Sequence, residues 1–308
     1  MNSSCCILEE PSLDVILPPI LLLEFIFGVV GNFFGLWMVF QEKKPLKPNS
    51  LYILSLTLAD FVVLLCVLLR ADYYIRKKNW IYGDIPCRLL LYIISAARAA
   101  GMVFLSLIAL TRYCRILFPF HKANTITVKQ ATAISITLWV SMFTLHSYVL
   151  TQPHLFYLNN AIQCESFSIC PRSSIAWHDV FFISLTSLSL LTISFCTIRI
   201  AFHLKENTID TNGKVGRAMR FLVLVAAIFF LCYLPGASVR VAIWALKSMK
   251  YEDCAYFRQS NLAFYYAIAL TYLYSVLNPI LYYFSSPSSH KLLPWMCKEN
   301  MFGESEAP

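Results

Sequence analysis

Seven apolar runs limit what this chain can fold into more than any other feature of its sequence. A helix needs ~20 mostly apolar residues to cross the hydrocarbon core of a bilayer. The runs are centred near Phe27, Leu58, Phe104, Ile136, Leu188, Phe229 and Leu270. Only 14% of the residues are charged, whereas soluble domains carry about 25%. The sequence therefore predicts an all-α membrane protein, a bundle of seven transmembrane helices.

The positions of the basic residues predict the topology of this bundle. Residues 1–42 contain no Lys or Arg, whereas Lys43, Lys44 and Lys47 directly follow the first run. Basic residues favour the cytosolic side, so we expect an extracellular N-terminus and, after seven spans, a cytosolic C-terminus. The expected location is the plasma membrane.

The seven spans divide the chain into three regions, and these exclude several functions. We expect an extracellular N-terminus over 1–14, a seven-helix domain over 15–285, and a cytosolic part over 286–308 that begins with a short interfacial helix. No soluble catalytic domain is left, and the six His show no metal-ligand spacing, so we predict that the chain is not an enzyme. The net charge of +8 lies on no domain free of the membrane, which argues against nucleic acid as a partner.

The cysteines predict disulfide bonds on the outer side. Six of the eleven lie in the expected outer segments: Cys5, Cys6, Cys87, Cys164, Cys170 and Cys254. An even set in an oxidising compartment is typical of a disulfide framework, but six cysteines allow 15 pairings and their spacing does not choose among them. Cys297, after the interfacial segment, is either S-acylated or a plain thiol. Asn2 begins a formal glycosylation motif.

Three arginines in the spans predict an anionic ligand. Arg98 lies 11 residues after Cys87 (98 − 87), hence ~16 Å into the membrane. A charge at that depth costs at least ~2.5 kcal/mol, so it should line a cavity and meet an anion. Arg70 and Arg240 lie in the outer parts of their spans, and guanidinium groups bind carboxylates through two hydrogen bonds. Each arginine also has an alternative interpretation. Arg70 and Arg240 could extend to the outer headgroups, and an internal acid such as Glu24 could neutralise Arg98.

Short motifs that occur in order in six of the seven spans resemble those of the rhodopsin-like receptors. They comprise Gly31-Asn32, Leu56 with Asp60, Trp80 with Cys87, Arg112-Tyr113, Trp139, Phe230 with Cys232, Leu234 and Pro235, and Asn278-Pro279 with Tyr282. Each motif is weak alone, but their joint occurrence is specific. The resemblance implies a seven-helix receptor that couples to a G protein.

This resemblance also implies a polar cluster in the middle of the membrane. Asn32, Asp60 and Asn278 match residues that hold a sodium ion in the resting state of such receptors, although Gly101 stands where a serine ligand is common. Polar groups at this depth are costly and usually functional. The alternative is a purely structural hydrogen-bonded cluster.

The same family assigns activation and G-protein coupling to a further set of residues. They are Thr111, Arg112, Tyr113, Pro235, Pro279 and Tyr282. The prolines remove backbone hydrogen bonds and permit kinks. Arg112 matches the arginine that meets the G protein, but its usual acidic neighbour is replaced by Thr111, so we expect raised basal activity.

Longer stretches resemble the hydroxycarboxylic acid receptors. They include 17–19, 23–28, 83–88, 166–170 and 282–288. The resemblance implies that Arg98 binds the ligand carboxylate. Further residues of the expected ligand site match positions in two members of this family. The lactate-type member has matches to Arg70, Glu165 and Arg240, and the nicotinic-acid-type member has matches to Ser166 and Tyr272. The disulfides that it implies are Cys87–Cys164, Cys5–Cys170 and Cys6–Cys254.

These observations predict a G-protein-coupled receptor for a small hydroxycarboxylic or monocarboxylic acid, acting through an inhibitory-type G protein to lower cyclic AMP. A receptor for oxo- or hydroxy-fatty acids is the nearer alternative, since apolar side chains are abundant enough to build a long channel. A membrane carboxylate transporter is the more distant one. Transporters usually contain paired repeats, and this sequence has no internal repeat.

Overall fold

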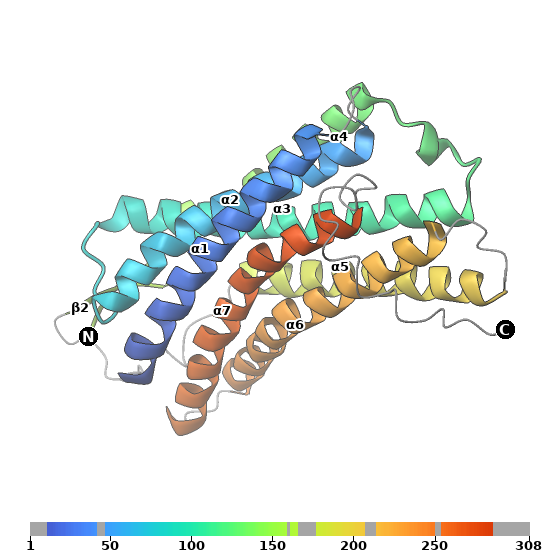
Figure 1. Cartoon of the computed structure of the whole chain (residues 1–308). Coiled ribbons are helices and arrows are strands. Elements are labelled where there is room, and N and C mark those ends of the chain that lie inside the picture. Colours follow the sequence, from blue (N-terminus) through green and yellow to red (C-terminus); the bar gives the residue numbers. More distant parts are fainter. Residues whose placement is uncertain are drawn as a thin grey trace, which may run out of the picture.

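The computed structural model describes residues 11–41, 47–158, 161–165, 177–206, 214–249 and 254–285. Within these ranges the chain forms seven long helices and one short hairpin (Figure 1). The helices are α1 (Pro11–Gln41), α2 (Pro48–Ile75), α3 (Asp84–Leu117), α4 (Val128–His146), α5 (Trp177–Glu206), α6 (Lys214–Ser248) and α7 (Cys254–Ser285). The predicted seven-helix bundle is therefore present. The expected interfacial helix, Asn2 and Cys297 lie outside the described residues.

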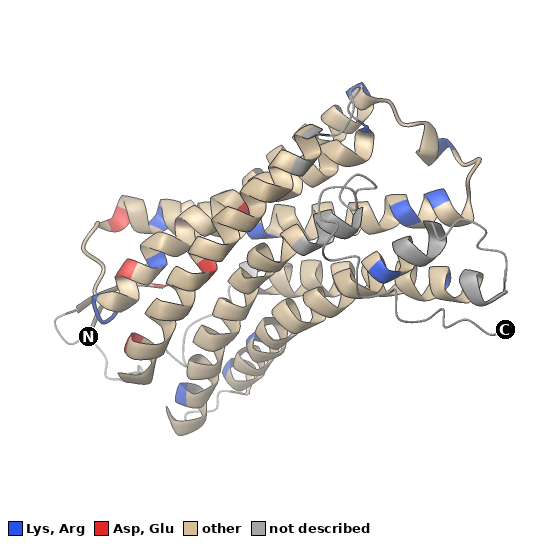
Figure 2. Ribbon diagram, in the orientation of Figure 1, with Lys and Arg blue, Asp and Glu red and all other residues tan. Residues whose placement is uncertain are grey.

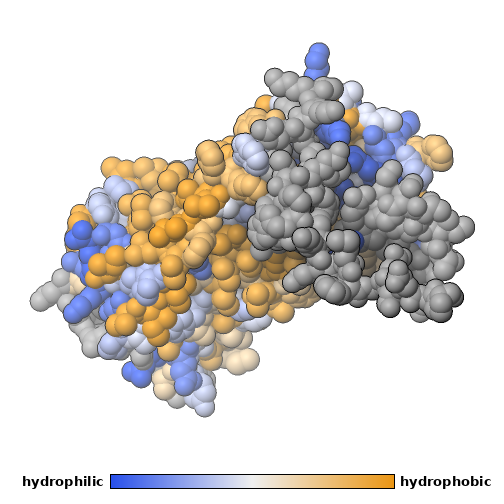
Figure 3. Space-filling model, viewed as in Figure 1, coloured by the Kyte–Doolittle hydropathy of each residue, from blue (hydrophilic) through white to orange (hydrophobic). Residues whose placement is uncertain are grey.

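The surface of the bundle suits a bilayer. Among the described residues, six of the seven helices contain a stretch long and apolar enough to cross a membrane. Large apolar side chains such as Phe27, Phe33 and Leu188 are more than 60% exposed, and orange residues cover the middle of the face in Figure 3. Most Lys and Arg lie toward the helix ends (Figure 2). Hydrocarbon is the solvent that such a surface requires.

Two clusters of buried side chains make up the core. The first, near the hairpin, contains Tyr73, Trp80 and Tyr265. The second fills the other half of the bundle and includes Phe229 and Tyr233, whose rings stack with centroids 4.6 Å apart. Aromatic pairs of this kind add attraction beyond that of the area they bury.

Glycine allows α1 to pack closely against α7. A Cβ on Gly31 would lie 2.9 Å from Cγ of Pro279, too close for any side chain without a shift. Beside this contact, Nδ2 of Asn32 donates to the carbonyl of Ser275 over 2.8 Å. Helices α6 and α7 each continue through their internal proline, Pro235 and Pro279.

A hairpin covers the end of the bundle at which α1 begins and α2 ends. Strands β1 (Leu155–Leu158) and β2 (Ala161–Cys164) pair antiparallel. Cys164, at the end of β2, forms a disulfide with Cys87 in the first turn of α3, as the family resemblance implied. The pairs Cys5–Cys170 and Cys6–Cys254 involve side chains outside the described part of the chain.

Candidate ligand pocket

A cavity lies under the hairpin and is bordered by six helices, α2 to α7. Three guanidinium groups line it, those of Arg70 from α2, Arg98 from α3 and Arg240 from α6. Phe182 from α5 and Tyr272 from α7 contribute aromatic surface. The space open to the centres of water-sized molecules is about 60 Å³. Three arginines that are far apart in the sequence thus meet at one small cavity.

Arg98 is buried but keeps hydrogen-bonding capacity. Its side chain is 8% exposed, and its guanidinium carbon lies 5.2 Å from the ring centroid of Phe182 and 5.8 Å from that of Tyr272. Its Nε has no hydrogen-bond partner. Within the described ranges, no ion pair joins Arg98 to Glu24. The alternative in which Glu24 neutralises Arg98 is therefore not the arrangement that the structure has.

Arg240 approaches the same aromatic ring. Its guanidinium carbon lies 4.5 Å from the ring centroid of Phe182 and 4.8 Å from that of Phe264. The faces of aromatic rings are electronegative and attract guanidinium groups. Arg98 and Arg240 thus share Phe182, and this ring keeps two like charges beside one cavity. A bound anion would reduce their mutual repulsion.

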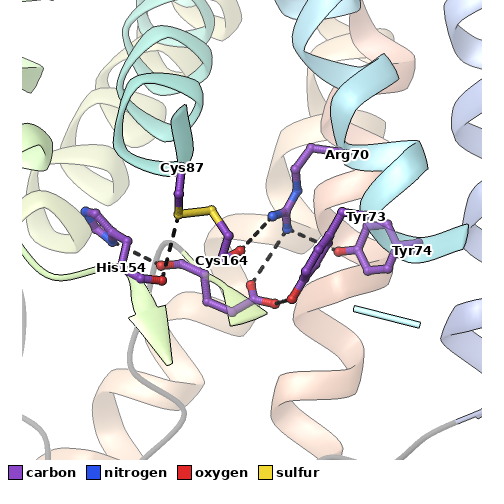
Figure 4. A network of polar contacts seen from close by, with 7 residues as sticks. Arg70, Tyr73, Tyr74, Cys87, His154 and Cys164 are labelled. Carbon is purple, nitrogen blue, oxygen red and sulfur yellow. Dashed lines mark hydrogen bonds and ion pairs between the residues drawn. A yellow bond between two sulfur atoms is a disulfide. The ribbon is translucent and has the colours of Figure 1, made fainter. Parts of the chain in front are cut away.

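Arg70 differs from the other two, because the receptor's own groups satisfy it. It is 3% exposed, donates to the carbonyl of Cys164 over 2.9 Å and to the Tyr74 hydroxyl over 3.3 Å, and forms a 3.7 Å ion pair with Glu165 (Figure 4). This burial excludes the interpretation in which Arg70 extends to the headgroups. Arg70 therefore joins α2 to the end of the hairpin while one side of it lines the cavity.

Glu165 completes this contact beneath the hairpin. Its carboxylate is 1% exposed, accepts a hydrogen bond of 2.8 Å from the Tyr73 hydroxyl and does not line the cavity. The His154 ring lies beside the carbonyls of Glu165 and Val149. Burial lowers the pKa of the His154 imidazole, so this ring adds no charge to the pocket at neutral pH. Glu165 acts here as the counter-ion of Arg70.

Eight other lining residues were not predicted from the sequence, and four of these are polar or aromatic. These four are Ser95, His146, His154 and Phe182. Ser95 lies three residues before Arg98, hence on the same helix face, and this spacing could have identified it. Tyr272 lines the cavity as the nicotinic-acid-type pattern suggested, whereas Ser166 lies outside the described residues.

The polar cluster lies deeper in the bundle. Nδ2 of Asn278 donates to the Asp60 carboxylate over 2.7 Å. Asn32 contacts backbone carbonyls instead, those of Gly28 and Ser275. The side-chain oxygens of both asparagines are buried and have no hydrogen-bond partner. Two amide oxygens and a carboxylate are ligands of the kind that hard cations prefer.

Arg112 lies in the half of the bundle remote from the hairpin. Its guanidinium carbon lies 5.5 Å from the ring centroid of Phe221 on α6. The Thr111 hydroxyl donates to the carbonyl of Ile108 and so to its own helix. Tyr113 packs against Phe195 of α5. The side chain of Tyr282 is outside the described part of the chain.

Comparison with known proteins agrees with this architecture. The sequence model of the 7 transmembrane receptor (rhodopsin family) matches residues 31–282. Hydroxycarboxylic acid receptor 3 of Homo sapiens is 37% identical over 288 residues, which are 93% of this chain and 74% of the relative. Hydroxycarboxylic acid receptor 1 of Homo sapiens is 35% identical over 94% of this chain and 82% of the relative. Oxoeicosanoid receptor 1 of Homo sapiens is 32% identical over 88% and 70%.

Seven membrane helices around a polar pocket under a disulfide-linked hairpin define a seven-transmembrane receptor. The chain belongs to the rhodopsin family of G-protein-coupled receptors, and the hydroxycarboxylic acid receptors are its relatives there. It is a multi-pass membrane protein and a receptor, not an enzyme. The transporter alternative is thereby set aside.

The Arg70–Glu165 pair predicts a loss of stability in Glu165→Gln. This substitution keeps the size of the side chain but leaves a buried guanidinium without its counter-ion, and breaking a buried pair costs about 3–5 kcal/mol. Asp84→Asn is the matched control, because Asp84 pairs with Arg88 at the surface, where the two side chains are 43% and 29% exposed, respectively. Exposed pairs contribute about 0–1 kcal/mol to stability. Thermal unfolding of the purified receptor in detergent measures both. Equal losses in the two variants would show that the buried pair has no special role.

Proposed function

We propose that this receptor detects a small hydroxycarboxylic or monocarboxylic acid and acts through an inhibitory-type G protein to lower cyclic AMP. In this proposal the receptor lies in the plasma membrane with its hairpin outside the cell. The observation that carries the proposal is the Arg98 guanidinium, which is buried beside a cavity and, among the described residues, has no carboxylate partner.

The pocket supports recognition of a carboxylate at two points. The planar guanidinium of Arg98 can donate two parallel hydrogen bonds to it, and Arg240 approaches the same space across Phe182. Ser95 also lines the cavity, and its hydroxyl, which donates to the carbonyl of Tyr92 over 3.0 Å, can accept a hydrogen bond from a hydroxyl group on the acid. Glu165 already balances the charge of Arg70, so Arg98 supplies the charge that favours the anion.

The size of the cavity favours a short acid over a long fatty acid. The space open to the centres of water-sized molecules is about 60 Å³, so the cavity is small. That space suits an acid of a few carbon atoms. The alternative ligand, an oxo- or hydroxy-fatty acid, would require additional room for a long acyl chain.

Binding at this position would act on several helices at once. The guanidinium groups belong to α2, α3 and α6, with Phe182 on α5 and Tyr272 on α7. A carboxylate shared by Arg98 and Arg240 draws α3 and α6 together at the hairpin end. The ligand increases the population of the active state only if it binds the active state more tightly than the resting state.

Arg98→Ala should abolish the response to the agonist acid. Removing one partner of a buried charge pair costs about 2–5 kcal/mol, hence a potency loss of at least ~30-fold. Arg98→Lys should lose most of the response, since an ammonium lacks the planar pair of donors. The measurement is inhibition of cyclic AMP by lactate, 3-hydroxybutyrate, nicotinate and hydroxylated fatty acids, at matched surface expression.

Arg76→Ala is the control for this experiment, because Arg76 is paired with Asp72 on the surface and does not line the cavity. It should respond like the wild type. An acid that signals equally well through Arg98→Ala would refute the proposed anchor. A response only to hydroxylated fatty acids would refute the assignment of a small ligand.

Thr111→Asp should reduce signalling in the absence of ligand. An aspartate there would place an acid next to Arg112 and stabilise the resting state by the 0–1 kcal/mol of an exposed ion pair, up to about fivefold in basal activity. Thr111→Asn has a similar size and no charge, so it should leave the basal level unchanged. Ligand-independent nucleotide exchange on the G protein measures both variants, and identical basal levels would contradict the expectation.

We further propose that Asp60, Asn32 and Asn278 hold a sodium ion in the resting receptor. The two partnerless amide oxygens and the carboxylate support this proposal. Replacing sodium by N-methylglucamine should raise agonist affinity about fivefold or more, as in typical allosteric coupling. Asp60→Asn should remove this difference. A sodium effect that persists in Asp60→Asn would favour a purely structural cluster.

A further inference from the structure

A second cavity lies on the outside of the bundle, between α1 and α7. Its walls include Leu23 and Phe27 from α1 and Leu273 and Val276 from α7. The space open to the centres of water-sized molecules is about 420 Å³. Leu23 and Phe27 are 53% and 62% exposed, so the groove opens toward the hydrocarbon and not into the receptor. It shares no lining residue with the acid pocket.

Close packing of the two helices ends the groove on one side. One turn beyond Phe27 and Val276, Gly31 meets Pro279, where a Cβ would lie 2.9 Å from the proline ring. The hydrogen bond from Asn32 to the carbonyl of Ser275 joins the helices at the same level. The groove is therefore a slot with one end closed by the α1–α7 contact.

Glu24 is the one carboxyl group among the lining residues of this slot, which are otherwise apolar apart from Tyr266. It lines the groove, it is 6% exposed, and its Oε2 has no hydrogen-bond partner. It follows Asp14 by ten residues (24 − 14), hence ~15 Å along the helix and near the middle of a ~30 Å hydrocarbon core. A carboxyl group without a partner at that depth is costly and marks a functional position.

We propose that the groove binds a membrane lipid whose acyl chain carries a hydroxyl group, and that this hydroxyl hydrogen-bonds to Glu24. The apolar walls match the chain, and the carboxyl group supplies the polar partner part-way along it. A neutral hydroxyl enters hydrocarbon at far lower cost than an ammonium group does. A sterol anchors its hydroxyl at the headgroups, which lie too far from Glu24 for a hydrogen bond.

Direct binding of two fatty esters to the full-length receptor in phosphatidylcholine nanodiscs tests this proposal. Methyl ricinoleate has a mid-chain hydroxyl and methyl oleate has none, and neither has a carboxylate for the arginine pocket. Wild type should bind the hydroxylated ester up to about tenfold more tightly, the upper end of what one net hydrogen bond between neutral groups contributes. Glu24→Leu should remove this preference. Leu273→Trp keeps Glu24 but fills the slot, so it should weaken binding of both esters.

Arg98→Ala serves as the control that separates this site from the acid pocket. It should lose the response to small acids and keep the preference between the esters, so either proposal can fail alone. Equal affinities of the two esters in wild type would overturn the lipid site, as would a preference that survives in Glu24→Leu. Displacement of methyl ricinoleate by cholesterol in wild type but not in Glu24→Leu would instead assign the groove to sterols and overturn the proposed class.

Discussion

The cost of keeping a guanidinium group away from water governs the hairpin half of this receptor. Arg70 and Arg98 are both buried, yet the fold treats them differently. Arg70 has a carbonyl, a tyrosine hydroxyl and a carboxylate around it, so its charge is balanced without a ligand. Arg98 has aromatic rings and a cavity beside it. A protein that spans a lipid bilayer can retain such a charge only where something else neutralises it.

The hairpin links these two arginines to one structure. The disulfide fixes Cys164 to α3, and Arg70 binds the carbonyl of the same cysteine from α2. The hairpin that covers the cavity is therefore attached to both α2 and α3 at Cys164. The residues that meet a ligand are in turn held by rigid helices, which limits the freedom lost when a ligand binds.

The seven apolar runs and the ordered motifs in six of the spans were sufficient to predict the bundle and the family. The depth of Arg98 along α3 likewise predicted a buried charge beside a cavity. The pairing of Arg70 with Glu165 could not be read from the residues, because it depends on how the hairpin folds back over α2, and no periodicity encodes that path. Phe182 was missed for the same reason, since an aromatic residue in an apolar helix has no distinct signal until its neighbours are known.

The single covalent link between the hairpin and the bundle in the described part of the chain gives the receptor a dependence on redox conditions. Reduction of Cys87 and Cys164 would leave the hairpin held near α2 and α3 mainly by noncovalent contacts such as those of Arg70. Thiol reagents in a purification buffer would then loosen the cover of the cavity without touching any residue that contacts a ligand. Affinities measured in such buffers would describe an opened receptor.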